Sequence, residues 1–474
     1  MHSRGWLVMA ALGTSLAGAQ GLPPAQMTPP AQVQLPLPPA SAADAAGGVA
    51  AGKTGAPLAL SLADAIERGL RQNLAPLLAQ SASQQARAQR LEAIAALLPR
   101  VDASAGELRQ KVNLAAFGLS VPGIPLIVGP FNVFQASATA DVPLVNVSAL
   151  QSARAARGLE SAAHDDYQAT RDLVVLAVAN QYLLSVADQS RVQAAQAELA
   201  TAASALTQAQ DMLRAGTVDR LAVVRAQVQR DRQQQQLTAA DNTLAKQRLQ
   251  LARAIGLPLD QTFRLSSTTP FAALAPPTPE TAVAQALATR PDYRAAQTIV
   301  RSAQLLLAAA RDQHLPTVSV NGGYGTIGHE LDSNHPVFTV GATINLPVFA
   351  GGLTKAHEIA AQAQLRDAQN RAADLRAAIA VQVRTALLDL ENNRAQVGVA
   401  RDARDLAQQE LTLAQDRFQA GVADNLEVVQ AQQSVADANE SYIATLYGYN
   451  LAKASLAQAL GVAANQYRNY LPIL

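Results

Sequence analysis

The sequence lacks cysteine and contains few aromatic residues. None of its 474 residues is cysteine, and only 4% are aromatic. The first absence excludes disulfide bonds, thiolate metal ligands, cysteine nucleophiles and a lipid-modified N-terminal cysteine. The second limits the cores that the chain can build, because aromatic side chains supply much of the buried area in thick cores. The residues are nevertheless 49% hydrophobic, and much of that fraction is alanine, which favours helices.

The chain also lacks an excess of either charge and a long internal apolar run. Its 37 Lys and Arg residues nearly balance 36 Asp and Glu residues, so the net charge is +1. This balance gives no basic surface for nucleic acid. After the N-terminus, the longest apolar run covers residues 173–179, far short of the ~20 residues of a membrane-spanning helix. We therefore expect no transmembrane helix.

The N-terminus has the pattern of a secretory signal peptide. Arg4 precedes an apolar run over residues 6–18, and Ala17-Gly18-Ala19 supplies the small residues of a cleavage site. We assign residues 1–19 to a signal peptide; an uncleaved membrane anchor is the alternative. Residues 20–57 are rich in Pro, Ala and Gly and have no apolar periodicity, which predicts a flexible segment.

The two halves of the chain repeat one pattern. Residues 98–101 (LPRV) match residues 315–318 (LPTV), and residues 215–219 (AGTVD) match residues 420–424 (AGVAD). We infer an internal duplication, in which repeat 1 covers residues 58–270 and repeat 2 covers residues 271–474. Repeat 1 is expected to have strands near 100–113 and 132–145 and a long helical hairpin at 147–256. Repeat 2 is expected to have strands near 317–328 and 337–347 and a hairpin at 354–461.

The expected strands alternate between apolar and polar residues. In the last strand Phe338, Val340 and Ile344 lie on one face, and Thr339 and Thr343 lie on the other. Each strand has about the ~9–11 residues that cross a bilayer when tilted, with one face for lipid and one for water. A soluble sheet with one buried face shows the same alternation. The membrane reading is favoured because the neighbouring helices are far too long to cover such a sheet.

Two very long helices are expected. Residues 147–213 contain no proline and one interior glycine, Gly158, and a helix of that length measures ~100 Å. Residues 354–420 are likewise free of proline. Their apolar positions, which include Leu375, Ile379 and Val383, recur at coiled-coil spacing. In each repeat a glycine turn leads into a returning antiparallel helix.

Four membrane strands require partners. Open strand edges are not tolerated in lipid, and the smallest closed barrels have ~8 strands. The chain is therefore expected to oligomerise, with two, three or four copies forming one barrel. The polar strand faces then line a pore, and the helical hairpins continue the barrel as a tube.

The residues at the second turn carry a family resemblance. Residues 417–432, RFQAGVADNLEVVQAQ, resemble the tip of the TolC-type outer-membrane efflux proteins, commonly R-[YF]-x-x-G-x-x-x-x-L-[DE]-V-x-x-A-Q. Residues 213–227 are the counterpart in repeat 1, and the resemblance spans residues 58 to about 465. It implies an α+β membrane protein: a homotrimer with a 12-stranded outer-membrane β-barrel, continued by a periplasmic α-helical coiled-coil barrel of 12 helices.

The resemblance also implies roles for the tips, which in that family dock a periplasmic adaptor and close the resting channel. The positions implied for adaptor docking are Arg214, Gly216, Thr217, Asp219, Arg417, Phe418, Gly421, Asp424 and Leu426. Two acidic positions form the periplasmic gate of the family; they fall on Glu427, which is acidic, and on Gln430, which is not. We expect a gate that is weaker or differently built. A ring of Glu427 carboxylates would still favour cations.

The tip residues can also be explained by the local geometry of helix ends, without the resemblance. Gly216 and Gly421 permit the left-handed backbone that ends a helix. Asp219, and Asp424 or Asn425, can cap the helix that follows. A purely structural turn therefore remains an alternative for any single tip residue.

Other candidate sites do not point to chemistry. Residues 323–328 spell G-x-G-x-x-G after an expected strand, but a dinucleotide site needs these glycines to open a helix; glycines in a crowded strand explain them better. His329, Glu330, Asp332 and His335 match no metal-ligand spacing. We expect no catalytic residue, no cofactor and no metal site. The apolar loop over residues 114–130 either crosses the pore mouth or packs between protomers.

Together these features predict an outer-membrane channel component of a tripartite efflux or type I secretion system. It would be a passive trimeric exit duct for small molecules or proteins, located in the outer membrane and in contact with its lipid, with the helical tube in the periplasm. Its partners would be a periplasmic adaptor protein and an inner-membrane transporter. The alternative is an exported non-channel coiled-coil scaffold protein. The sequence does not identify the cargo or the particular pump.

Overall fold

The computed structural model describes residues 44–50, 57–118, 125–266, 271–330, 332–420, 422–423 and 425–471. The predicted signal peptide and most of the predicted flexible segment 20–57 lie outside these residues. The chain forms two compact units. The first, which we call the sheet unit, contains Ala88–Ala156 and Leu305–Ile359. The other described residues form the second, which we call the helical unit.

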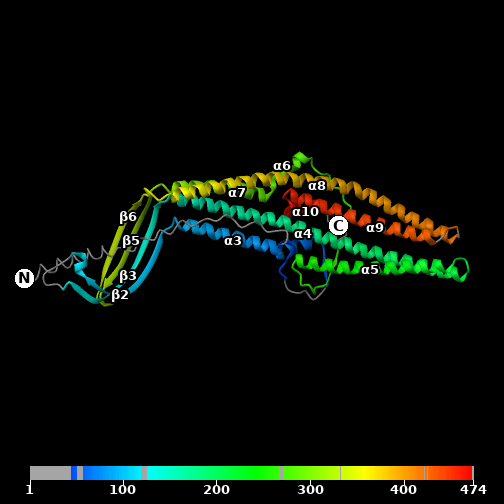
Figure 1. The fold of residues 1–474 in the computed structure, drawn as a ribbon, viewed down its shortest axis with the longest axis horizontal. Coiled ribbons are helices and arrows are strands. Elements are labelled where there is room, and N and C mark those ends of the chain that lie inside the picture. The colour runs from blue at the N-terminus through cyan, green and yellow to red at the C-terminus, as the bar shows by residue number, and fades with distance from the viewer. Residues whose placement is uncertain are drawn as a thin grey trace, which may run out of the picture. The chain divides into compact units, whose positions relative to one another are not determined.

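The sheet unit is built on four antiparallel strands (Figure 1). They are β2 (Arg100–Asn113), β3 (Ile127–Val145), β5 (Thr317–Gly328) and β6 (Asn334–Asn345). Their order is β2-β3-β5-β6, so within the described residues β2 and β6 each pair on one side only. Pro99 and Pro316 directly precede β2 and β5. Proline cannot continue a helix, which explains why α3 (Leu74–Ala95) and α7 (Pro291–Asp312) end before these strands.

The strand register gives the sheet two chemically different faces. Residues directly opposite each other in a ladder share a face, and one such row runs Ala103, Ala138, Tyr324 and Phe338 across all four strands. We call the face of this row face A. The next row, Asp102, Thr139, Gly323 and Thr339, lies on the opposite face, which we call face B. Most of face A is therefore apolar and most of face B is polar.

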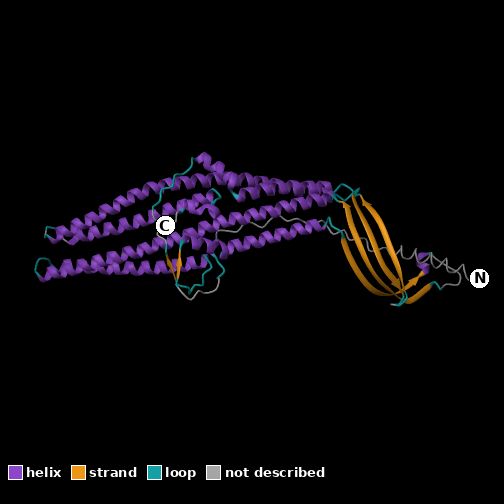
Figure 2. Ribbon diagram, turned by 180° about the vertical axis from the view of Figure 1, so that it is seen from behind, coloured by secondary structure: helices purple, strands orange, loops and turns teal. Residues whose placement is uncertain are grey.

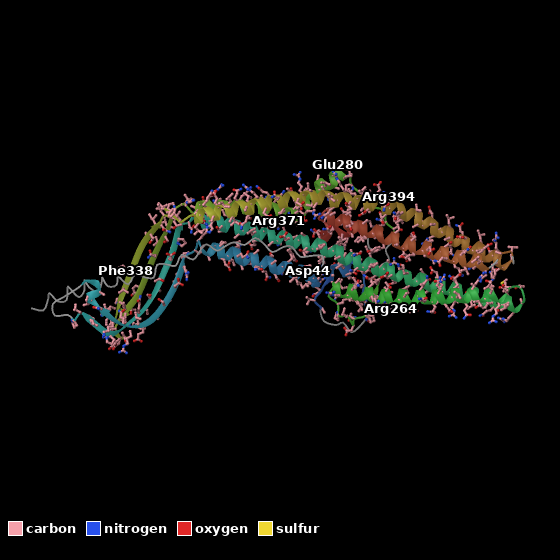
Figure 3. The ribbon with its side chains drawn as sticks, in the orientation of Figure 1. Asp44, Arg264, Glu280, Phe338, Arg371 and Arg394 are labelled. Carbon is pink, nitrogen blue, oxygen red and sulfur yellow. The ribbon has the colours of Figure 1, made fainter. Side chains whose placement is uncertain are left out.

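The apolar side chains of face A are exposed. Phe338, which Figure 3 labels on β6, and Val340 are each 77% exposed, and Ile344 is 72% exposed. A soluble sheet would bury such a face against a second layer. The helices of the sheet unit instead pack with one another; in one small cluster Ala93 of α3 packs with Ala153 and Ala156.

The β2–β3 connection differs from the expected loop over residues 114–130. β3 begins at Ile127 instead of near residue 132, because Asn113 and Val112 pair with Ile127 and Val128. Leu114 then opens a short 3-10 helix, η2 (Leu114–Phe117), and its N–H donates to the carbonyl oxygen of Leu126 at 2.7 Å. Residues 119–124 of this connection lie outside the described residues.

The glycines of residues 323–328 lie in strand β5 and open no helix. A Cβ atom at Gly325 would lie 2.4 Å from the carbonyl oxygen of Ala136 on β3. Such a distance is too short for any side chain, so close approach of the neighbouring strand explains this glycine.

The helical unit is a set of long antiparallel helices (Figure 2). The first hairpin joins α4 (Val147–Arg214) to α5 (Arg220–Ala254), and the second joins α8 (Leu353–Gln419) to α9 (Asn425–Ala459). α2 (Leu62–Gln72), α6 (Pro279–Thr289) and α10 (Ala463–Tyr470) are shorter. α3, α4, α7 and α8 contribute residues to both units. In the part of the chain that the structure describes, every helix is too short or too polar to cross a membrane.

Away from the tips, the described residues of the helical unit form two large hydrophobic cores. The first surrounds a parallel pair of three-residue strands, β1 (Leu58–Leu60) and β4 (Phe263–Leu265). The Tyr182 hydroxyl of α4 donates to the carbonyl oxygen of Leu60 at 3.1 Å. In the second core, Ile379 and Val383 of α8 pack with Leu456 of α9. The coiled-coil stripe of residues 354–420 therefore lies in a core.

Residues 44–50, which belong to the predicted flexible segment 20–57, pack against the first core. Residues Asp44–Ala46 form a short 3-10 helix, η1. Asn73, at the end of α2, donates from Nδ2 to the carbonyl oxygens of Ala45 at 2.7 Å and Ala254 at 2.9 Å. These contacts join distant segments, so no local pattern in the sequence shows them.

Candidate functional site: the two helical tips

The first tip is the turn between α4 and α5. Gly216 adopts φ of +75°, a left-handed conformation that favours glycine. The Thr217 N–H and hydroxyl both donate to the carbonyl oxygen of Met212, at 2.9 and 3.0 Å. Asp219 then caps α5 by accepting the Ala222 N–H at 2.9 Å. The turn therefore has the glycine C-terminus and acidic N-cap expected from the sequence.

The polar side chains of this tip remain at the surface. Gly216, Thr217 and Asp219 are exposed, and Arg214 is exposed while it pairs with Asp211 one turn earlier. An exposed pair of this kind contributes little stability. These groups are therefore available to a partner.

The second tip is the turn between α8 and α9. The Val422 N–H donates to the carbonyl oxygen of Arg417 at 3.1 Å, which closes the last turn of α8. Leu426 is exposed. The predicted docking residues Gly421 and Asp424 lie outside the described residues.

Phe418 is buried, in contrast to the other predicted docking residues that the structure describes. Its side chain is 4% exposed and packs in a small core with Leu411 of α8 and Val428 of α9. Met212 and Val218 of the first tip pack against the same core. Phe418 therefore holds the two tips together and is not at the surface of the chain.

Asn425 is a tip residue whose role the sequence did not reveal. It begins α9, is buried, and donates from Nδ2 to the carbonyl oxygen of Ala222 in α5 at 3.0 Å. Its position after a glycine turn suggested only a helix cap. The partner carbonyl comes from the other hairpin, so only the tertiary structure could identify it.

The gate positions predicted from the family lie at the start of α9. Glu427 Oε2 is 3.3 Å from Arg417 Nε, so the carboxylate forms an ion pair within its own hairpin. Gln430 is exposed. Arg417 therefore offsets part of the negative charge that Glu427 places at this tip.

An open groove runs along the last turns of α4 beside the first tip. Its lining residues recur at intervals of three and one along α4, which places them on one helix face. They are Ser204, Thr207, Gln208, Asp211, Met212 and Ala215. This is the pattern of a helix face that can accept another helix.

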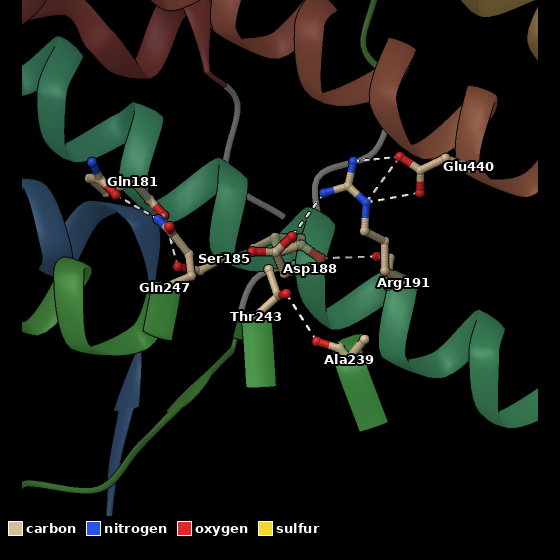
Figure 4. A network of polar contacts seen from close by, with 10 residues as sticks. Gln181, Ser185, Asp188, Arg191, Ala239, Thr243, Gln247 and Glu440 are labelled. Atoms are coloured by element: carbon tan, nitrogen blue, oxygen red, sulfur yellow. Dashed lines mark hydrogen bonds and ion pairs between the residues drawn. The ribbon is translucent and has the colours of Figure 1, made fainter. Parts of the chain in front are cut away.

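The two hairpins are joined by polar contacts farther from the tips (Figure 4). Arg191 of α4 binds Asp188 at 2.8 Å and Glu440 of α9 at 2.7 Å. Hydrogen bonds to Glu440 raise the pKa of the Arg191 guanidinium, so it stays charged. Gln247 of α5 donates to the carbonyl oxygen of Gln181 in α4 at 3.2 Å. α4 is therefore bonded to α5 and to α9 at this level.

One buried carboxyl group ties α4 to the C-terminal helix. Asp172 accepts the N–H of Ala464 in α10 at 2.6 Å. Burial raises the pKa of Asp172 to about 6, although the Ala464 N–H and Arg171 act in the opposite direction. This group therefore titrates below neutral pH.

The described residues contain no group of three or more His, Cys, Asp or Glu side chains arranged to hold a metal ion. In the loop before β6, His329 Nδ1 lies 3.0 Å from the Ser333 hydroxyl. These contacts give no geometry for a reaction.

Comparison with known proteins gives a family match over most of the chain. The family profile of the outer membrane efflux proteins matches residues 66–257 and 282–462. The chain is 26% identical over 387 residues to the toluene efflux pump outer membrane protein TtgF of Pseudomonas putida, which covers 77% of this chain and 76% of that protein. It is 24% identical over 318 residues to the outer membrane protein TolC of Vibrio cholerae, covering 64% of this chain and 71% of that protein.

Solved structures show the same fold. The outer membrane protein VceC of Vibrio cholerae superimposes with a TM-score of 0.74 at 19% identity, over 84% of this chain and 96% of that one. The CmeC outer membrane channel of Campylobacter jejuni gives a TM-score of 0.75 at 18% identity, over 93% of this chain and 98% of that one.

Proposed function

Because the chain belongs to the outer membrane efflux protein family, we propose that it is the outer-membrane channel of a tripartite efflux or type I secretion system. It is a passive trimeric exit duct for small molecules or proteins. A periplasmic adaptor docks at the helical tips, and an inner-membrane transporter supplies the energy.

The observation that carries this proposal is a sheet with an exposed apolar face and, among the described residues, no strand beyond β2 or β6. Face A exposes Val101, Tyr324, Phe338 and Val340, and lipid is a solvent that suits such a face. Backbone groups at the edges of β2 and β6 need partners in lipid. Three copies of the four-stranded sheet joined edge to edge form a closed twelve-stranded barrel, and face B lines its pore.

The helical unit supplies a second surface for the same assembly. α8 carries an exposed apolar stripe on the side away from its core positions, at intervals of seven or eleven residues. The stripe consists of Val381, Leu388, Val399, Leu406 and Leu413. α5 carries another, at heptad spacing, of Leu221, Val224, Val228 and Leu249. In Figures 1 and 2, α5 and α8 lie on opposite sides of α4 and α9. The α8 stripe of one copy therefore packs on the α5 stripe of the next and closes the tube.

The matching elements of the two halves support the proposed duplication. α4 and α8 have 68 and 67 residues, and α5 and α9 have 35 each. The family profile also matches the chain in two stretches, one in each half. A duplicated unit gives each copy two hairpins of equal length, as an even tube wall requires.

The tips form the periplasmic entrance and the docking site. Arg214, Thr217, Asp219, Arg417 and Leu426 present polar and apolar groups at the surface, and the open groove of α4 lies beside them. Gly216 and the buried Phe418 set the shape of the turns, and Gly421 and Asp424 are further docking positions of the family motif. Glu427 and Gln430 line the gate, where the Arg417–Glu427 ion pair reduces the negative charge.

A cross-linking experiment tests the assembly, because the chain has no cysteine of its own. Val228→Cys with Leu406→Cys should give covalent trimers with a bis-maleimide, whereas the control Gln227→Cys with Leu406→Cys should give far fewer. The same trimers in planar bilayers should show discrete conductance steps, and Glu427→Gln should lower their cation selectivity. A monomer that is soluble without detergent and gives no channel would support the scaffold alternative instead.

A further inference from the structure

The apolar and polar faces of the sheet exchange sides near the end that carries η2. Face B is polar through the row of Asp102 and Thr139. Toward η2, the next rows of face B include Val337, which pairs with Gly325, and Ile327, which pairs with Gln135. Beyond them Leu108 lies opposite Val133, and Gln110 lies opposite Phe131. Face B therefore gains apolar side chains over its last rows, where they alternate with the polar Gln110, Gln135 and His335.

Face A changes in the opposite direction at the same level. Its apolar rows end with Ala105 and Ala136, which pair with each other. In the rows that follow, Asn132 donates from Nδ2 to Glu107 Oε1 at 2.8 Å. Gly328 pairs with Asn334 in β6. Polar groups therefore replace apolar ones on face A where apolar groups replace polar ones on face B.

Aromatic residues on face A mark the boundary. Tyr324 pairs with Phe338, and Phe134 lies opposite Glu107 in a row nearer η2. Aromatic side chains collect where a membrane barrel leaves the lipid. The exchange of faces thus begins at the level where lipid would end, and face A no longer needs apolar side chains.

The apolar residues of face B near η2 are not covered by the rest of the described chain. Leu108 is 57% exposed, Val337 is 44% exposed and Ile327 is 37% exposed. These exposed apolar side chains do not make face B a lipid-facing surface, because the rows of face B farther from η2 are polar.

We propose that Leu108, Phe131, Val133, Ile327 and Val337 form an apolar collar that lines the pore at its outer mouth. This inference rests on the proposed function, in which face B lines the duct and the helical tips form its entrance. η2 lies at the end of the strands opposite to the end that leads into α4 and α8, so we place the exit there. The collar disfavours hydrated ions near the pore wall, because its apolar side chains offer no hydrogen bonds to their water. It binds the apolar surface of a leaving solute, which loses contact with water there. The collar thereby selects for apolar or amphiphilic molecules at the exit.

The test compares two pairs of matched substitutions in reconstituted trimers. Leu108→Ser with Val133→Ser places hydroxyl groups in the collar. Ala105→Ser with Ala136→Ser makes the same change in the same two strands on face A. The collar pair should raise the single-channel K⁺ conductance about twofold or more. It should also weaken block by tetrabutylammonium, added as an apolar cation, about fivefold. The control pair should change neither value.

The outcomes separate this inference from the proposed function. If the wild-type protein forms no channel, the proposed function fails. If it forms channels whose conductance and block are unchanged by the collar pair, the collar is overturned and the duct stands. Should the collar pair fail to yield trimers, Ile327→Ser with Val337→Ser tests the same surface from β5 and β6, with the same expected and contrary results.

Discussion

The helical unit and the sheet unit solve the burial of apolar residues in opposite ways. In the helical unit, Ile379 and Leu456 are almost fully buried in cores that the chain itself completes. In the sheet unit, Phe338 and Val340 project from face A with nothing from the described chain above them. The first unit can hold its fold by its own packing. The second leaves an apolar face without cover from the described chain, and the proposed function assigns that face to lipid and the sheet edges to neighbouring copies.

The largest effect is expected in the core of the helical unit. Ile379→Ala removes a fully buried side chain between α8 and α9 and should cost about 2–5 kcal/mol of stability. Its control is Val381→Ala on the exposed stripe of the same helix. Thermal unfolding in detergent, followed by far-UV circular dichroism, should show a clear fall in the midpoint for Ile379→Ala. For Val381→Ala the midpoint should change only if the trimer dissociates. Equal shifts for both variants would mean that α8 has no separate core face and contact face.

A smaller effect is expected on the sheet, and it should depend on the face. Val340→Arg on face A places a charge against lipid and should cost about 2–4 kcal/mol near the middle of the bilayer. Thr339→Arg, the next residue, places the same charge on face B, where the pore is wet. The amount of trimer extracted from the outer membrane should fall for Val340→Arg and stay near the wild-type level for Thr339→Arg. The reverse result would exchange the lipid and pore faces.

The smallest effect is the change of stability with pH, which we expect from Asp172 in the helical unit. Burial raises the pKa of Asp172 to about 6 from its ordinary value of 3.8. The folded state therefore binds this proton more tightly than the unfolded state does, and stability should fall as the pH rises from about 4 to about 6. Asp172→Asn can still accept the Ala464 N–H and lacks this titration. Its unfolding midpoint should vary less across that range; an unchanged pH profile would show that Asp172 is not the group responsible.

Much of the fold follows from local signals. Pro99 and Pro316 end helices and start strands, and the glycine turn at Gly216 separates α4 from α5. These positions act through steric limits on the backbone, so they need no information from distant residues. The alternation in β6 likewise follows from the two-residue period of a strand.

Other parts could not be read locally because distant segments create them. β1 and β4 have three residues each, too few to show a period, and they form only because they pair across the chain. The composition of residues 44–50 predicted flexible chain. In the structure Asn73 donates a hydrogen bond to the carbonyl oxygen of Ala45 and holds this segment in place. The sequence placed the start of β3 near residue 132, whereas the strand begins at Ile127. Pairing with β2 extends it there, and the sequence shows no alternation over these residues.

The tips show the same division. The glycine and capping residues were evident from the sequence, since they act within one turn. Three features depend on which helices meet: Phe418 is buried, Asn425 joins the two hairpins, and Arg417 forms an ion pair with Glu427.

The sequence by itself determined the long helices and the four long strands, because helix and strand periods, prolines and turn glycines act over a few residues. The tertiary structure alone decided which residues share a face of the sheet. That property depends on strand register, and a shift of one residue would move every side chain to the other face.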